Sequence, residues 1–140
     1  MFDLNRQDMI NHLFTEKIMA KKILVAEDNK FTATQYVKIL ESENHQVEIV
    51  KDGEECIQKY AKSINADSKK STFDVLILDL SMPQRNGAEV AGDILSLNPE
   101  QKIILASAYA LSTERNFSKL KDKVLFLQKP FQLSKILELV

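Results

Sequence analysis

The stretch VLILDLSMP at residues 75–83 places four consecutive apolar residues directly before an aspartate. A short run that is entirely apolar is typical of a strand covered on both faces, as in a parallel sheet. Four similar runs occur at residues 22–26, 47–50, 103–106 and 124–127. The run at 47–50 alternates around Glu48, which indicates an edge strand. The pattern therefore predicts five strands.

Amphipathic stretches separate these runs, and their apolar residues recur at helical spacing. The clearest stripes are Ala33, Val37 and Leu40; Cys56, Ile57, Tyr60, Ala61 and Ile64; and Val90, Ala91, Ile94 and Leu95. Residues 111–120 form a weaker pattern, residues 133–140 close the chain, and the polar segment 65–72 is predicted to be a surface loop. The alternation predicts an α/β fold of (βα)5 type, a doubly wound five-stranded parallel sheet with helices on both faces.

The first twenty residues differ from this repeat. An extra amphipathic helix is predicted here, because Asn5 and Asp8 suit its N-terminal cap and four apolar residues form one stripe. That stripe is Ile10, Leu13, Phe14 and Ile18. Met19 also resembles a natural start, so upstream codons are the alternative explanation. We therefore divide the chain into an N-terminal extension, residues 1–20, and a domain at residues 21–140.

Composition excludes several classes of protein. A chain of 140 residues is one domain by length. Its 19 Lys and Arg residues balance 20 Asp and Glu residues, which argues against binding nucleic acid through bulk charge. No apolar run is long enough to span a bilayer, so membrane insertion is not expected. The single cysteine, Cys56, fits the stripe of a core helix and a reducing, cytoplasmic compartment.

Polar side chains follow four of the five predicted strands. Glu27 and Asp28 follow the first strand, Asp79 the third, Ser107 the fourth and Lys129 the fifth. In a parallel sheet these ends share one edge, where open α/β sheets bind their ligands. Three carboxylates, a hydroxyl and an ammonium group are therefore expected to converge.

Three clustered carboxylates repel one another unless a positive charge compensates. Oxygen ligands without His or Cys favour Mg²⁺, and Mn²⁺ also fits such a site. Lys129 adds a cation suited to a phosphate group. The simpler alternative, that each acid is only a solvated strand end, does not explain why the matched polar groups follow four strands.

With these residues at its strand ends, the sequence resembles the receiver domain of a two-component response regulator. It is similar to the single-domain chemotaxis response regulator. The resemblance rests on ILVAEDN at 23–29, DLSMP at 79–83, NG at 86–87, ASA at 106–108 and KPF at 129–131. It spans residues 21–139 and implies the flavodoxin-like strand order 2-1-3-4-5. The Lys129–Pro130 bond is expected to be cis, and Asn86-Gly87 to support positive φ in a turn.

The resemblance implies that Asp79 accepts a phosphoryl group from a sensor histidine kinase, a phosphotransfer protein or a small phosphodonor. It implies that Asp28 binds Mg²⁺ directly and Glu27 through water, although Glu27 stands where aspartate is commoner. The backbone carbonyl of Ser81 is implied as a further ligand. By this resemblance the chain is a signalling protein and not an enzyme in the ordinary sense. At most, it catalyses its own phosphorylation by a donor and its own dephosphorylation.

By the same resemblance, Ser107 and Lys129 bind phosphoryl oxygens, and Ser107 with Phe126 forms a switch that alters a protein-binding surface. Phe126 could instead be a plain core residue. Ser81 and Tyr109 match positions that tune dephosphorylation, although Tyr109 could simply be a loop tyrosine facing solvent. The downstream partner is expected to be a protein. Because the final helix ends early, at Val140, we expect a monomer or a weak homodimer.

Two other functions fit the sequence less well. A receiver fold that acts as an adaptor without phosphorylation does not account for the full set of site residues. A Mg²⁺-dependent phosphatase with an aspartate nucleophile usually carries a second acid two residues later, where this chain has Ser81. Flavin binding is weaker still, because residues 28–31 offer no phosphate-binding cradle.

Overall fold

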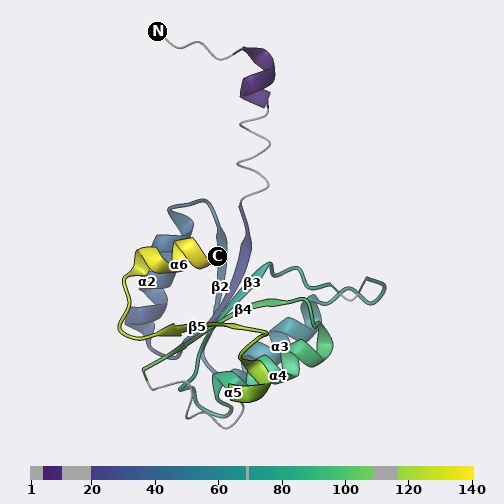
Figure 1. The fold of residues 1–140 in the computed structure, drawn as a ribbon, viewed down its shortest axis with the longest axis vertical. Coiled ribbons are helices and arrows are strands. Elements are labelled where there is room, and N and C mark those ends of the chain that lie inside the picture. Colours follow the sequence, from purple (N-terminus) through teal and green to yellow (C-terminus); the bar gives the residue numbers. More distant parts are fainter. Residues whose placement is uncertain (1–4, 11–19, 69, 109–116) are drawn as a thin grey trace.

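The computed structural model describes residues 5–10, 20–68, 70–108 and 117–140. Five strands among these residues form a parallel sheet (Figure 1). The strands are β1 (Lys22–Ala26), β2 (Gln46–Val50), β3 (Val75–Asp79), β4 (Lys102–Ser107) and β5 (Leu125–Gln128). Their order is β2-β1-β3-β4-β5, which confirms the predicted flavodoxin-like topology. All five predicted strands are present, within one or two residues of the expected bounds.

Helices cover both faces of the sheet, as predicted. They are α2 (Lys30–Glu41), α3 (Gly53–Ser63), α4 (Gly87–Leu97), α5 (Phe117–Leu120) and α6 (Leu133–Leu139). Helices α2 and α6 lie on one face, and α3, α4 and α5 lie on the other (Figure 1). Among the described residues, no helix has the length and hydrophobicity that a membrane crossing requires.

The core has two halves, one on each side of the sheet. Ile23 and Val25 of β1 pack with residues of α2 and α6, whereas Leu24 packs on the opposite side with residues of α3 and α4. This division follows from the alternation of side chains along a strand. Because both faces of the central strands are covered, β3 is buried throughout, including Asp79 at its end.

Side chains before three helices satisfy free backbone N–H groups. Asn29, Asp52 and Asn86 are the N-caps of α2, α3 and α4, and each side chain accepts a hydrogen bond from the third residue that follows. The prediction of positive φ at Asn86-Gly87 is wrong. Asn86 has φ −72° because it caps α4, and the left-handed residue in this loop is Gln84, with φ 71°.

The predicted N-terminal helix is present where the structure describes it, over residues 6–10. The backbone N–H of Asp8 donates to Asn5 Oδ1 at 2.8 Å, which confirms the expected cap. Ile10 is exposed, and the other three residues of the predicted stripe, Leu13, Phe14 and Ile18, lie outside the described residues.

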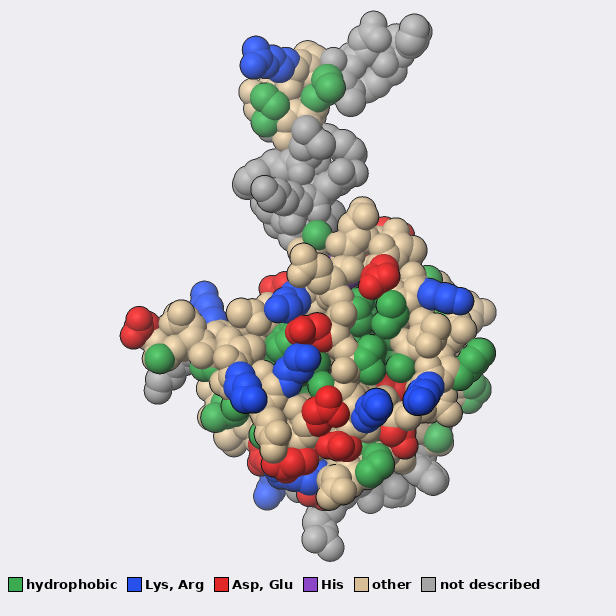
Figure 2. All heavy atoms as spheres, turned by 180° about the vertical axis from the view of Figure 1, so that it is seen from behind, with side chains coloured by type: hydrophobic (Ala, Val, Ile, Leu, Met, Phe, Trp, Pro, Cys, Tyr) green, Lys and Arg blue, Asp and Glu red, His purple; other side chains and the backbone are tan. Residues whose placement is uncertain are grey.

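Acidic and basic side chains alternate over one face of the molecule (Figure 2). Figure 2 shows the face opposite to the view of Figure 1, where Lys and Arg side chains are interspersed with Asp and Glu. Among the described residues of this face there is no continuous basic patch. This distribution agrees with the balanced charge of the sequence.

Two glycines of α4 provide a matched pair for a stability prediction. A Cβ atom at Gly87 would lie 2.5 Å from the Asp79 carbonyl oxygen and 2.8 Å from Leu105 Cδ1, whereas a Cβ at Gly92 meets nothing within 4 Å. We expect Gly92→Ala to raise the free energy of unfolding by about 0.5–1 kcal/mol, because alanine loses less backbone entropy. Gly87→Ala should lower it by about 1–3 kcal/mol through overpacking.

Urea unfolding of both variants at one pH measures this difference. Equal effects of the two substitutions would contradict the close approach of α4 to the end of β3. Because Gly87 packs against the Asp79 backbone, its substitution should also disturb the site described next.

Candidate functional site

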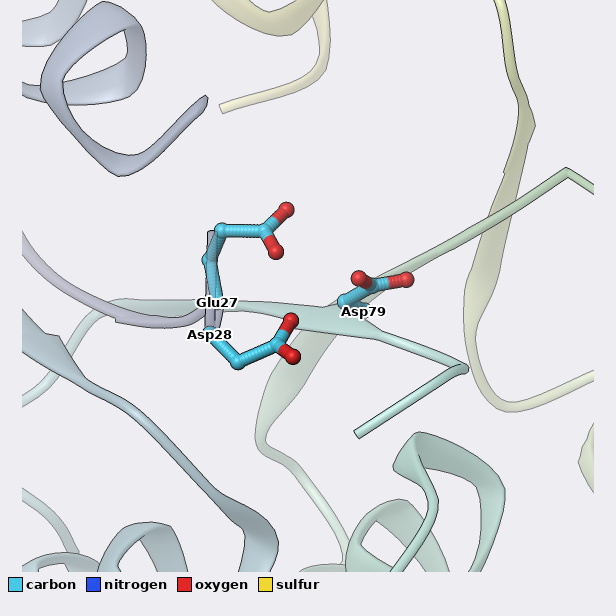
Figure 3. Close-up of side chains that lie close together, drawn as sticks. All are labelled: Glu27, Asp28 and Asp79. Carbon is cyan, nitrogen blue, oxygen red and sulfur yellow. The ribbon is translucent and has the colours of Figure 1, made fainter. Parts of the chain in front are cut away.

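Three carboxylates meet at the carboxyl edge of the sheet. Glu27 and Asp28 directly follow β1, Asp79 ends β3, and β1 and β3 are paired neighbours. Each residue offers a carboxylate oxygen, and these oxygens all lie within 4.8 Å of one another. Figure 3 shows the Glu27 and Asp28 side chains extending from the end of β1 on the side where Asp79 lies. The sequence prediction that these acids converge is confirmed.

Lys129 supplies the positive charge beside them. Its Nζ lies 3.4 Å from Asp79 Oδ1 and 3.6 Å from Glu27 Oε1. The backbone N–H of Lys129 donates to the Ser107 carbonyl at 2.7 Å, which ties the loop after β5 to the end of β4. The Lys129–Pro130 bond is cis, as expected.

Glu27 is the most deeply buried acid of the cluster. Its side chain is almost completely buried, and Oε2 accepts a hydrogen bond from the Asn29 N–H at 3.2 Å. Burial raises the pKa of Glu27 to about 7; the charge of Asp79 also raises it, while the Asn29 N–H and Lys129 lower it. Glu27 Oε1 is buried without a hydrogen-bond partner among the described residues.

These observations fit a divalent cation. Three carboxylates face one lysine, so the cluster is short of positive charge. Among the described residues, none donates a hydrogen bond to the buried Glu27 Oε1, whose nearest cation is Lys129 Nζ at 3.6 Å. Asp28 is exposed, which leaves one side open to the water ligands that Mg²⁺ retains. Glu27, Asp28 and Asp79 are therefore the residues that could hold Mg²⁺.

Of the remaining predicted residues, Ser81 and Ser107 lie close to Asp79 in the chain or in the sheet. Ser81 is exposed, and its backbone N–H donates to Asp79 Oδ1 at 3.3 Å. Ser107 is buried at the end of β4, beside Asp79 in the sheet because Asp79 pairs with Ala106. Phe126 of β5 is partly buried against the core on the α3–α4 side. Tyr109 lies outside the described residues.

Sequence reasoning missed two aromatic residues of α2. Tyr36 is buried, and its pKa is raised by burial and by the negative charges of Glu27 and Asp79. Its place between Ala33 and Leu40 on the same helical stripe could have revealed it. Phe31, by contrast, is 73% exposed, and nothing in the periodicity distinguishes it.

Comparisons with known proteins agree with this geometry. The family model of the response regulator receiver domain matches residues 23–140. Protein CcdB of Bacillus subtilis is 32% identical over 123 residues, covering 85% of this chain and 93% of that protein. A CheY-like receiver domain protein from Methanospirillum hungatei has a TM-score of 0.71 and 26% identity, covering 85% of this chain and 89% of that one.

A crystal structure of the CheX–CheY–BeF₃–Mg²⁺ complex from Borrelia burgdorferi is also similar, with a TM-score of 0.69 and 25% identity over 84% of each chain. Receiver domains are signalling proteins that bind Mg²⁺ at an acidic pocket and interact with histidine kinases and phosphotransfer proteins. Fold, acidic cluster and family model lead to one assignment: the chain belongs to the response regulator receiver domain family.

Proposed function

We propose that this chain accepts a phosphoryl group on Asp79, in a Mg²⁺-dependent reaction, from a histidine kinase or a phosphotransfer protein. One observation carries the proposal. Asp79 lies within the acidic cluster and 3.4 Å from Lys129, and its side chain is less deeply buried than that of Glu27, the other acid near Lys129. A nucleophile in this position has cation sites on two sides, and phosphoryl transfer depends mainly on positioning and charge neutralisation.

The transfer step forms a bond between an Asp79 oxygen and phosphorus and breaks the bond from phosphorus to the donor, which leaves with the bonding electrons. When bound, Mg²⁺ neutralises charge on the phosphoryl oxygens. We assign its direct ligands to Asp28, Asp79 and the Ser81 carbonyl, and contact through water to Glu27. Mn²⁺ fits the same oxygen ligands.

Lys129 and Ser107 are proposed to hold the other phosphoryl oxygens. Ser107 moves toward its new acceptor, and Phe126 fills the space that it leaves. Because Phe126 packs partly against the core, this movement changes a surface that includes β5. Ser81 and Tyr109 tune the rate of autodephosphorylation, and the signal passes to a downstream protein.

The biological setting is part of the proposal. The chain acts in the cytoplasm as a monomer or weak homodimer, without nucleic acid and without inserting into a membrane. Residues 1–20 form an extension separate from the receiver unit at 21–140. The buried free thiol of Cys56 suits a reducing compartment.

A small acyl phosphate tests the central claim without a partner protein. The full chain is incubated with acetyl phosphate and either Mg²⁺ or an excess of chelator, and its intact mass is followed with time. We expect one added phosphoryl group that requires Mg²⁺ and that peptide mapping places on Asp79. An unchanged mass with Mg²⁺ present would overturn the proposal in favour of an adaptor that is not phosphorylated.

A further inference from the structure

An apolar groove of about 600 Å³ adjoins the acidic cluster. One wall is formed by the start of α2, with Phe31 and Tyr36, and the other by the segment after β5, with Pro130 and Phe131. The rings of Tyr36 and Phe131 are tilted toward each other, with their centroids 6.5 Å apart. Three aromatic residues therefore line the groove, and Phe31 is the most exposed of them.

Phe31 is the unusual member of this set. Its side chain is 73% exposed, the highest exposure among the large apolar residues that the structure describes. A phenyl ring left in water gives up the free energy that burial provides. A ligand that covers Phe31 therefore gains apolar contact that this chain does not supply itself.

The charge of the groove specifies the polar end of that ligand. Of the described residues that line it, none is acidic and Lys129 alone is charged. Lys129 Nζ also lies 3.4 Å from Asp79 Oδ1, so the groove continues into the phosphoacceptor site through this side chain. The complementary molecule is an anion with an aromatic body, with its anionic end beside Lys129.

We propose that the groove binds the leaving group of small aromatic acyl phosphates, so that these donors phosphorylate Asp79 faster than acetyl phosphate does. This inference rests on the proposed function. An Asp79 oxygen bonds to phosphorus while the bond from phosphorus to the acyl oxygen breaks. An aromatic carboxylate departs with the electron pair, and no proton or oxidant is needed. Apolar contact with Phe31 positions the donor without taking part in the chemistry.

Benzoyl phosphate and acetyl phosphate are the probes. Rate constants for phosphorylation of the full chain with Mg²⁺ are measured for wild type, Phe31→Ala and Leu97→Ala. Leu97 is a matched control, because it is also exposed but lies at the end of α4, in a different pocket beside Asp74 and Lys102. We expect the ratio of benzoyl to acetyl rates to fall about tenfold in Phe31→Ala and to remain unchanged in Leu97→Ala. Rates with acetyl phosphate should be equal in all three proteins.

Each other outcome contradicts the inference in a recognisable way. An unchanged ratio in Phe31→Ala overturns the groove's role while leaving phosphorylation of Asp79 intact. Failure of both donors on wild type overturns the proposed function itself. If Phe31→Ala slows transfer from a phosphohistidine protein but leaves the benzoyl ratio unchanged, the groove serves a protein donor, and selection of small molecules is refuted.

Discussion

An Asp79→Asn variant is expected to gain no phosphoryl group from acetyl phosphate in the presence of Mg²⁺. The amide has no anionic oxygen to attack phosphorus, and the other two carboxylates of the cluster extend from the end of β1 rather than β3. We expect the rate of phosphorylation to fall by a factor of at least about 100, as for removal of a nucleophile. Intact-mass spectrometry over time measures the rate directly.

Asp122→Asn is the matched control, because Asp122 is exposed and lies outside the acidic cluster. This variant should be phosphorylated at the wild-type rate. Equal unfolding midpoints of the two variants would show that loss of phosphorylation does not come from loss of fold. Phosphorylation of Asp79→Asn at the wild-type rate would place the acceptor elsewhere and contradict the central assignment.

Replacement of Glu27 by glutamine is expected to stabilise the protein when divalent cations are absent. Burial raises the pKa of Glu27 from 4.5 to about 7, so the folded state is less stable when Glu27 is ionised than when it is protonated. Each unit of pKa corresponds to about 1.4 kcal/mol, which gives a cost of about 3 kcal/mol once Glu27 is ionised. Glutamine keeps the shape of the side chain without the charge.

The benefit of Glu27→Gln depends on pH in a defined direction. Below pH 4.5 Glu27 is protonated in both folded and unfolded states, so wild type and variant should be equally stable. Because the folded-state pKa is the higher one, wild type loses stability as pH rises from 4.5 to about 7, and the variant does not. Urea unfolding in chelator at pH 4.5 and pH 8 measures this divergence.

Mg²⁺ should reverse the order of stability. A cation that binds only the folded state stabilises it by mass action, and wild type retains one more carboxylate to bind it. Addition of Mg²⁺ at pH 8 is therefore expected to raise the unfolding midpoint of wild type more than that of Glu27→Gln. Glu41→Gln, at an exposed position, is the control and should match wild type throughout. A destabilised Glu27→Gln in chelator would show that Glu27 contributes through its ion pair with Lys129.

Much of the fold could be predicted from the sequence because the signals are local. Apolar runs at five places and helical stripes between them predict the parallel sheet, and the structure follows them closely. The acids of the site were predictable for the same reason, because Glu27 and Asp28 follow one strand and Asp79 ends its neighbour at the same edge of the sheet. The backbone conformation of the loop before α4 was harder to predict from the sequence, because asparagine at position 86 suits both a left-handed turn and a helix cap.

Sequence by itself determined which side chains reach the edge of the sheet, because strand period and strand ends are encoded by neighbouring residues. Only the tertiary structure decided how those side chains affect one another. The burial of Glu27 beside Asp79 and Lys129, the approach of α4 at Gly87 and the groove beside Phe31 each depend on segments far apart in the chain. Burial, close packing and charge interaction act across space, so no local pattern records them.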